Sequence, residues 1–90
     1  MLSERLKNFI AIWCNVDADF EEVTEMLHDD PEGDFAPWLK EDLRLAIRNE
    51  ELTPVVTYEL TGIGFDDQRA VDNWLRRRWA AWFPEEPYPE

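Results

Sequence analysis

The sequence predicts an all-α fold: a single small bundle of four to five helices with a mobile, Pro-rich C-terminal tail. Apolar residues recur at helical spacing in most segments, and N-capping residues precede several of these segments. The chain has 90 residues, of which 44% are hydrophobic, and contains neither a linker nor an internal repeat. Ninety residues are enough for one folded domain and too few for two. We therefore expect one helical domain over residues 1–83 and an extended acidic tail over residues 84–90.

The segment 66–83 is the clearest helix. Its large apolar residues share one wide face: Val71, Trp74, Leu75, Trp79, Trp82 and Phe83. A buried aromatic side chain removes roughly 150–250 Å² from water, so this face can form the centre of a small core. The predicted core is Trp13, Phe35, Leu39, Trp74, Trp79 and Trp82. An exposed face that receives a partner is the alternative interpretation.

Two further helices precede the first proline. Ser3 is the expected cap of a helix that reaches about Val16 and has one apolar face, made by Leu2, Leu6, Phe9, Ile10 and Trp13. Asp19 and Glu22 form a capping pair for a second, short helix. Its apolar side holds Phe20, Val23, Met26 and Leu27, and its outer face is acidic.

A loop over 29–34 separates these helices from a third, which we expect to be capped by Asp34 and to reach about Glu50. Pro37 falls in its first turn, where the missing N–H costs little. The buried stripe is Phe35, Leu39, Leu43 and Ala46 or Ile47, and Trp38 and Leu45 lie on an adjoining face.

The segment 53–62 fits two structures. Val56, Tyr58 and Leu60 alternate with polar residues as in a half-buried strand. No other segment is suited to pair with such a strand, however, and Thr53, Pro54 and Gly62 are a cap, a first residue and a terminator of a helix. We favour the helix. A turn follows, and Asp66 or Asp67 caps the last helix.

The net charge of −12 is the most informative bulk property. No Lys or Arg occurs between Asn8 and Leu39, whereas nine acids do: Asp17, Asp19, Glu21, Glu22, Glu25, Asp29, Asp30, Glu32 and Asp34. Such a charge disfavours nucleic acid and anionic membranes and favours a basic protein partner. Solubility alone is the alternative explanation, although acids kept for solubility are usually interspersed with bases.

The sequence gives no sign of catalysis or of a cofactor. Cys14 lies in an apolar helical pattern and is expected to be a buried, inert thiol. His28, the only histidine, is expected to be solvated or to cap a helix end. One Cys and one His cannot fill a zinc shell, and the acidic loop lacks the EF-hand spacing. We expect a cytoplasmic protein that is not an enzyme, spans no membrane and is monomeric when free.

Arg76, Arg77 and Arg78 span most of one helical turn, so they cannot form a continuous basic strip. We expect them to pair with Asp72 and with acids on neighbouring helices, and to lay their stems over the rim of the tryptophan face.

The chain resembles the small immunity proteins of bacterial contact-dependent growth inhibition (the CdiI group) and of polymorphic toxin systems. The matching features are the aromatic segment 9–13 running into Asp17 and Asp19, the acidic segment 21–27, and the segment 64–66 that leads into Trp74-Leu75 and Trp79. The resemblance implies a non-enzymatic inhibitor that binds the toxin domain of a sibling cell's delivery protein, often a nuclease with a basic surface. The identity of the toxin stays open.

We expect the acidic interval to bind the cognate toxin C-terminal domain and steer its association. The expected partner-binding residues are the nine acids together with Trp38 as an aromatic anchor; Tyr58 is the other candidate anchor. One alternative is an acidic DNA mimic or adaptor for a basic regulatory protein. Another is a small structural subunit of a larger assembly, which would expose an apolar patch.

Overall fold

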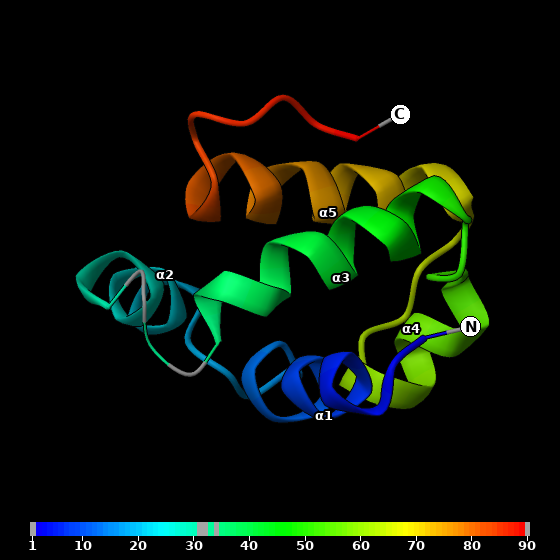
Figure 1. Cartoon of the computed structure of the whole chain (residues 1–90). Coiled ribbons are helices and arrows are strands. Elements are labelled where there is room, and N and C mark those ends of the chain that lie inside the picture. Colours follow the sequence, from blue (N-terminus) through cyan, green and yellow to red (C-terminus); the bar gives the residue numbers. More distant parts are fainter. Residues whose placement is uncertain (1, 31–32, 34, 90) are drawn as a thin grey trace.

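The computed structural model describes residues 2–30, 33 and 35–89, and over these residues the chain is helical, without a strand (Figure 1). The prediction of an all-α bundle is confirmed. The five helices are α1 (Glu4–Trp13), α2 (Phe20–Asp29), α3 (Ala36–Arg48), α4 (Pro54–Thr61) and α5 (Gln68–Trp82).

Four of the helices begin where the predicted caps stand. The side chains of Ser3, Asp19, Thr53 and Asp67 accept hydrogen bonds from backbone N–H groups in the first turns of α1, α2, α4 and α5. Each bond satisfies a donor that the helix leaves without a partner. Asp34, the predicted cap of α3, lies outside the described residues. The N-cap position of α3 is Phe35, whose side chain makes no capping bond. α1 and α3 end slightly earlier than expected, at Trp13 and Arg48.

The segment 54–61 is a helix, as favoured, and not a strand. Thr53 Oγ accepts from the N–H of Val56, and Pro54 occupies the first helical position. Gly62 ends the helix at φ 78°, a left-handed conformation that glycine adopts without strain. The alternation does not match burial in the helix, since Thr57 and Thr61 are buried whereas Val55 and Tyr58 are exposed.

The core is built around α5. Trp79 is 1% exposed and Leu39 is fully buried, while Trp74 and Trp82 are also buried, so the tryptophan face of α5 is core. Trp13 and Phe35, which we expected in the core, are only partly buried against it. They belong to an aromatic layer at its edge, in which the Phe35 ring lies 5.3 Å from that of Phe9 and 6.0 Å from that of Trp13.

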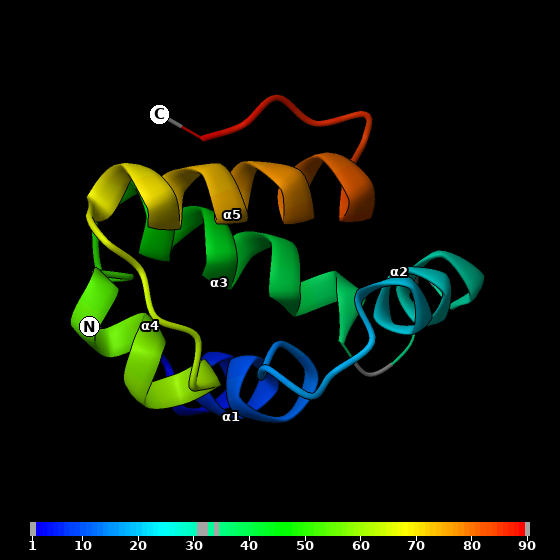
Figure 2. The same ribbon diagram turned by 180° about the vertical axis from the view of Figure 1, so that it is seen from behind.

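Figures 1 and 2 show that α3 lies between α5 and α1, while α2 and α4 lie at opposite ends of the molecule. α1 packs against α3 and α4, and α2 packs against α5. Asp42 on α3 ties down the start of α1, because its carboxylate accepts from Ser3 Oγ at 2.7 Å and from Arg5 at 2.8 Å. These hydrogen bonds hold the pKa of Asp42 below its usual value.

The prediction of a mobile tail is not confirmed. After α5 the chain turns back and runs along α5 (Figure 1). The indole N–H of Trp79 donates to the carbonyl of Glu86 at 3.0 Å, and the Glu86 carboxylate pairs with Lys40 at 3.3 Å and Arg44 at 3.4 Å. The Tyr88 ring packs edge-on against that of Trp79. These contacts fix the tail to α3 and α5.

Candidate functional site

Seven of the nine predicted acids lie in the described part of the chain, and all seven are exposed. They occupy the turn between α1 and α2, the outer side of α2, and its C-terminal end. We call this set the acidic surface: Asp17, Asp19, Glu21, Glu22, Glu25, Asp29 and Asp30. The other two, Glu32 and Asp34, lie outside the described residues.

The acidic surface is positioned by the amphipathic pattern of α2. Val23 and Leu27 are buried. At 100° per residue, Glu21, Glu25 and Asp29 follow one another at spacings of four on the opposite side of the helix. Like charges at this spacing repel one another, which destabilises an isolated helix by a few tenths of a kcal/mol per pair. Packing must therefore offset this repulsion.

Packing against α5 provides that compensation. The Phe20 ring stacks on the ring of Trp82 with centroids 6.2 Å apart, and the Trp82 indole N–H donates to Thr24 Oγ at 3.1 Å. At the start of the helix, Asp19 Oδ1 accepts from the N–H groups of Glu21 and Glu22. Asp19 thus has a structural role in addition to its charge.

None of the seven carboxylates forms an ion pair with a described residue, whereas acids elsewhere do. Asp42 pairs with Arg5, Glu41 with Arg44, and Glu86 with Lys40 and Arg44. The ion pairs thus neutralise charge near α3 and leave that of the acidic surface uncompensated. The asymmetry seen in the sequence is preserved in space.

The two candidate aromatic anchors differ in their surroundings. Trp38 is half-buried, its ring lies edge-on to that of Phe9 at 6.1 Å, and the Arg5 guanidinium stands 4.9 Å above it. Much of the Trp38 side chain is thus buried in the contact between α1 and α3. Tyr58 is 58% exposed, but it lies on α4, at the far end of the molecule from α2.

Two arginines of α5, Arg76 and Arg78, contact different aromatic rings. The Arg78 guanidinium stands 3.9 Å above the Trp74 ring and 4.9 Å from the Phe20 ring, and Arg76 stands 4.2 Å above Tyr88. Arg78 lies over the tryptophan rim as expected, and the contact is made by its guanidinium. The expected ion pair with Asp72 is not formed by Arg77 or Arg78 within the described residues. Asp72 accepts from Gln68. The three arginines form no continuous basic strip.

Cys14 is buried and lies beside Arg78. Burial favours the neutral thiol and raises the pKa of Cys14 to about 11, although the neighbouring guanidinium opposes the shift. Burial also lowers the pKa of Arg78. A thiol with so little thiolate is a poor nucleophile.

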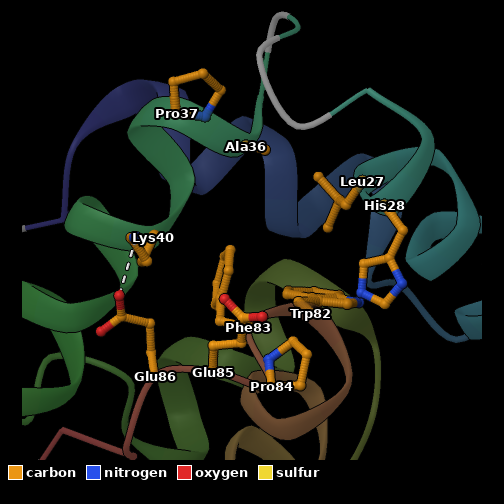
Figure 3. A pocket seen from close by; sticks show the side chains of 10 residues that line it. All are labelled: Leu27, His28, Ala36, Pro37, Lys40, Trp82, Phe83, Pro84, Glu85 and Glu86. Atoms are coloured by element: carbon orange, nitrogen blue, oxygen red, sulfur yellow. Dashed lines mark hydrogen bonds and ion pairs between the residues drawn. The ribbon is translucent and has the colours of Figure 1, made fainter.

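A cleft of about 430 Å³ lies where α2, α3 and the start of the tail meet (Figure 3). Leu27, Trp82 and Phe83 give it apolar walls, and His28, Lys40 and Glu85 give it polar groups. This site could not be predicted while the tail, which forms part of its wall, was expected to be mobile. The sequence signal for this site was the Phe83-Pro84 step, where the proline ends the aromatic helix and allows the chain to turn back.

In the part of the chain that the structure describes, no three metal-ligating side chains gather. No described helix has the length and apolarity needed to cross a bilayer. No family model, curated protein or solved structure matches the chain.

Proposed function

We propose that this protein is an immunity protein that binds a cognate toxin domain, a basic nuclease domain, and neutralises it through the acidic surface. The observation that carries the proposal is the set of seven exposed carboxylates, none of which has an ion-pair partner among the described residues. Uncompensated charge of one sign on one side of a small domain attracts a partner of the opposite sign.

A nuclease supplies such a partner because its active-site surface must attract phosphates. The acidic surface presents carboxylates along α2 and at both of its ends, so it can compete for the cationic groups that would contact a nucleic acid backbone. The protein acts by binding and needs neither turnover nor a cofactor for this function. We infer the class of the toxin from the resemblance to contact-dependent immunity proteins, and we infer the binding surface from the charge distribution.

The test is protection of growth. The toxin domain to be tested is the C-terminal domain of any large delivery protein that a neighbouring reading frame encodes. Cells expressing that domain are scored for growth with and without the immunity candidate. We expect the wild-type protein to protect and the double variant Glu25→Lys, Asp29→Lys to fail. Neither change falls in the first turn of α2, and Lys at position 29 suits the C-terminal end of the helix dipole. Loss of protection will therefore not reflect loss of folding.

The matched control is Glu59→Lys with Asp66→Lys. Each pair of substitutions changes the net charge from −12 to −8, since each replacement of an acid by Lys raises the net charge by two. Glu59 and Asp66 are exposed and lie outside the acidic surface. We expect this control to protect fully. Equal protection by both double variants would contradict the proposed role of the acidic surface.

A second function is favoured by a separate observation. Val55 and Tyr58 are 66% and 58% exposed and lie three residues apart on α4, which suits docking into a larger assembly. A protein acting as a structural subunit would lose its partner in the variant Val55→Ser, Tyr58→Ser and retain it in Glu25→Lys, Asp29→Lys. Co-purification of each variant with associated proteins separates this function from the first. A DNA mimic or an adaptor for a basic regulatory protein would also bind its partner through the acidic surface. It would differ from an immunity protein because the wild-type protein would not protect cells from the toxin domain.

A further inference from the structure

The cleft between α2, α3 and the tail contains two neighbouring glutamates in different situations. Glu86 is bound by Lys40 and Arg44. Glu85 is exposed and forms no ion pair with a described residue, and it lines the cleft together with Phe83 and Trp82 (Figure 3). Because Glu86 and Glu41 together neutralise Lys40 and Arg44, the cleft presents the negative charge of Glu85 against aromatic walls.

We infer that this cleft receives an arginine side chain from the basic partner protein, an inference that rests on the proposed function and specifies how the partner is recognised. The planar guanidinium stacks on an aromatic ring and donates to a carboxylate at the same time. The cleft offers both groups, with Leu27 available to contact the aliphatic stem.

The protein itself shows that its rings accept guanidinium groups. Arg78 stands 3.9 Å above Trp74, and Arg76 stands 4.2 Å above Tyr88. Trp82 is only 6% exposed, and it forms a fixed wall because its indole N–H donates to Thr24 and its ring stacks on Phe20. The half-buried Phe83 is the ring of the cleft that is available to a guanidinium. A preorganised wall reduces the entropy lost on binding.

The position of the cleft joins it to the acidic surface. A smaller hollow, lined by Leu27 and Ala36 as the cleft is, extends to Asp30. His28 in the cleft precedes Asp29 in the chain. A partner attracted by the acidic surface therefore meets the cleft at the edge of the same interface. Anionic occupants are disfavoured by Glu85 and by the net charge of −12.

The test titrates the full chain with N-acetyl-arginine amide and follows the ¹⁵N NMR signals of the Trp82 indole and of the backbone N–H groups of Phe83, Glu85 and Glu86. We expect saturable shifts confined to the cleft. N-acetyl-citrulline amide has nearly the same shape without the charge and is expected to give much smaller shifts. In Glu85→Gln we expect affinity for the arginine probe to fall about fivefold, the loss of a charge-assisted contact at a partly exposed site. Glu59→Gln, a matched loss of charge on α4, is expected to bind as the wild type does.

Equal binding of the citrulline probe, or unchanged binding in Glu85→Gln, would overturn the inference. A wild-type protein that forms dimers which Glu85→Gln dissociates would also overturn it, since the occupant would then be a second copy. This experiment and the growth assay fail independently. Protection that depends on Glu25 and Asp29, without a response to the arginine probe, would remove the cleft and retain the immunity function. Binding of the arginine probe without protection of growth would retain the cleft and remove the immunity function.

Discussion

Cys14 shows how one buried residue links the core to pH. Its side chain is 2% exposed, and burial raises the pKa of its thiol from 9.0 to about 11. In the unfolded chain the thiol ionises near its ordinary pKa, whereas the folded protein keeps the proton. Stability from this group is therefore complete below pH 9 and is lost as pH rises toward 11.

The predicted size of the loss is about 2–3 kcal/mol, from a shift of about two units at roughly 1.4 kcal/mol each. Urea unfolding across this pH range measures it. Cys14→Ala serves as the control, because it removes the thiol and leaves every other titratable group in place. The variant is expected to be less stable at neutral pH and to show a shallower decline above pH 9. Parallel pH curves for the two proteins would contradict the assignment to Cys14.

At the scale of the helix, the N-cap of α2 stabilises a helix whose outer side carries like charges. Asp19 Oδ1 accepts from two backbone N–H groups, at 3.0 Å and 3.3 Å. Asp19→Ala is expected to destabilise the protein by about 1 kcal/mol, as removal of an N-cap usually does. Thermal unfolding followed by circular dichroism measures the change.

Glu21→Ala is the matched control for Asp19→Ala. It removes the same charge from an exposed position in the first turn without removing a capping bond. Its expected cost is within about 0.5 kcal/mol, as for most surface substitutions. If the two variants were equally stable, the contribution of Asp19 would be its charge alone and the cap would be unimportant.

Helix positions could be predicted because their signals are local. Ser3, Asp19, Thr53 and Asp67 each cap a helix through N–H groups two or three residues away. Exposure of the acids on α2 follows from helical spacing in the same way. The acidic surface could therefore be predicted from the sequence.

The tail and the cleft could not be predicted, because their contacts are long-range. The carboxylate of Glu86 meets Lys40 and Arg44 across more than forty positions in the chain. Three prolines and exposed acids suggest a free segment, and no local pattern shows that the Trp79 indole will bind the Glu86 carbonyl. Since the tail forms one wall of the cleft, missing its position meant missing Glu85 as a site residue.

At the scale of the whole molecule, charge is sorted by position. The molecule measures 33 × 28 × 22 Å, and the acidic surface lies at the α2 end. Interactions between exposed charges are screened over about 30 Å at 0.01 M ionic strength and over about 3 Å at 1 M. At low salt, therefore, a basic partner experiences the field of this end before contact is made.

The association rate with the toxin domain is expected to fall at least about tenfold between these two ionic strengths, as electrostatically steered association does. Stopped-flow fluorescence measures the rate, with the tryptophans of this protein as the signal. Glu25→Lys with Asp29→Lys should bind more slowly at low salt and approach the wild-type rate at high salt, whereas Glu59→Lys with Asp66→Lys should keep most of the salt dependence. If the two double variants lost it equally, net charge and not the acidic surface would steer association. Full protection by Glu25→Lys with Asp29→Lys, together with an association rate insensitive to salt, would instead place the interface on α5, around the exposed Arg77.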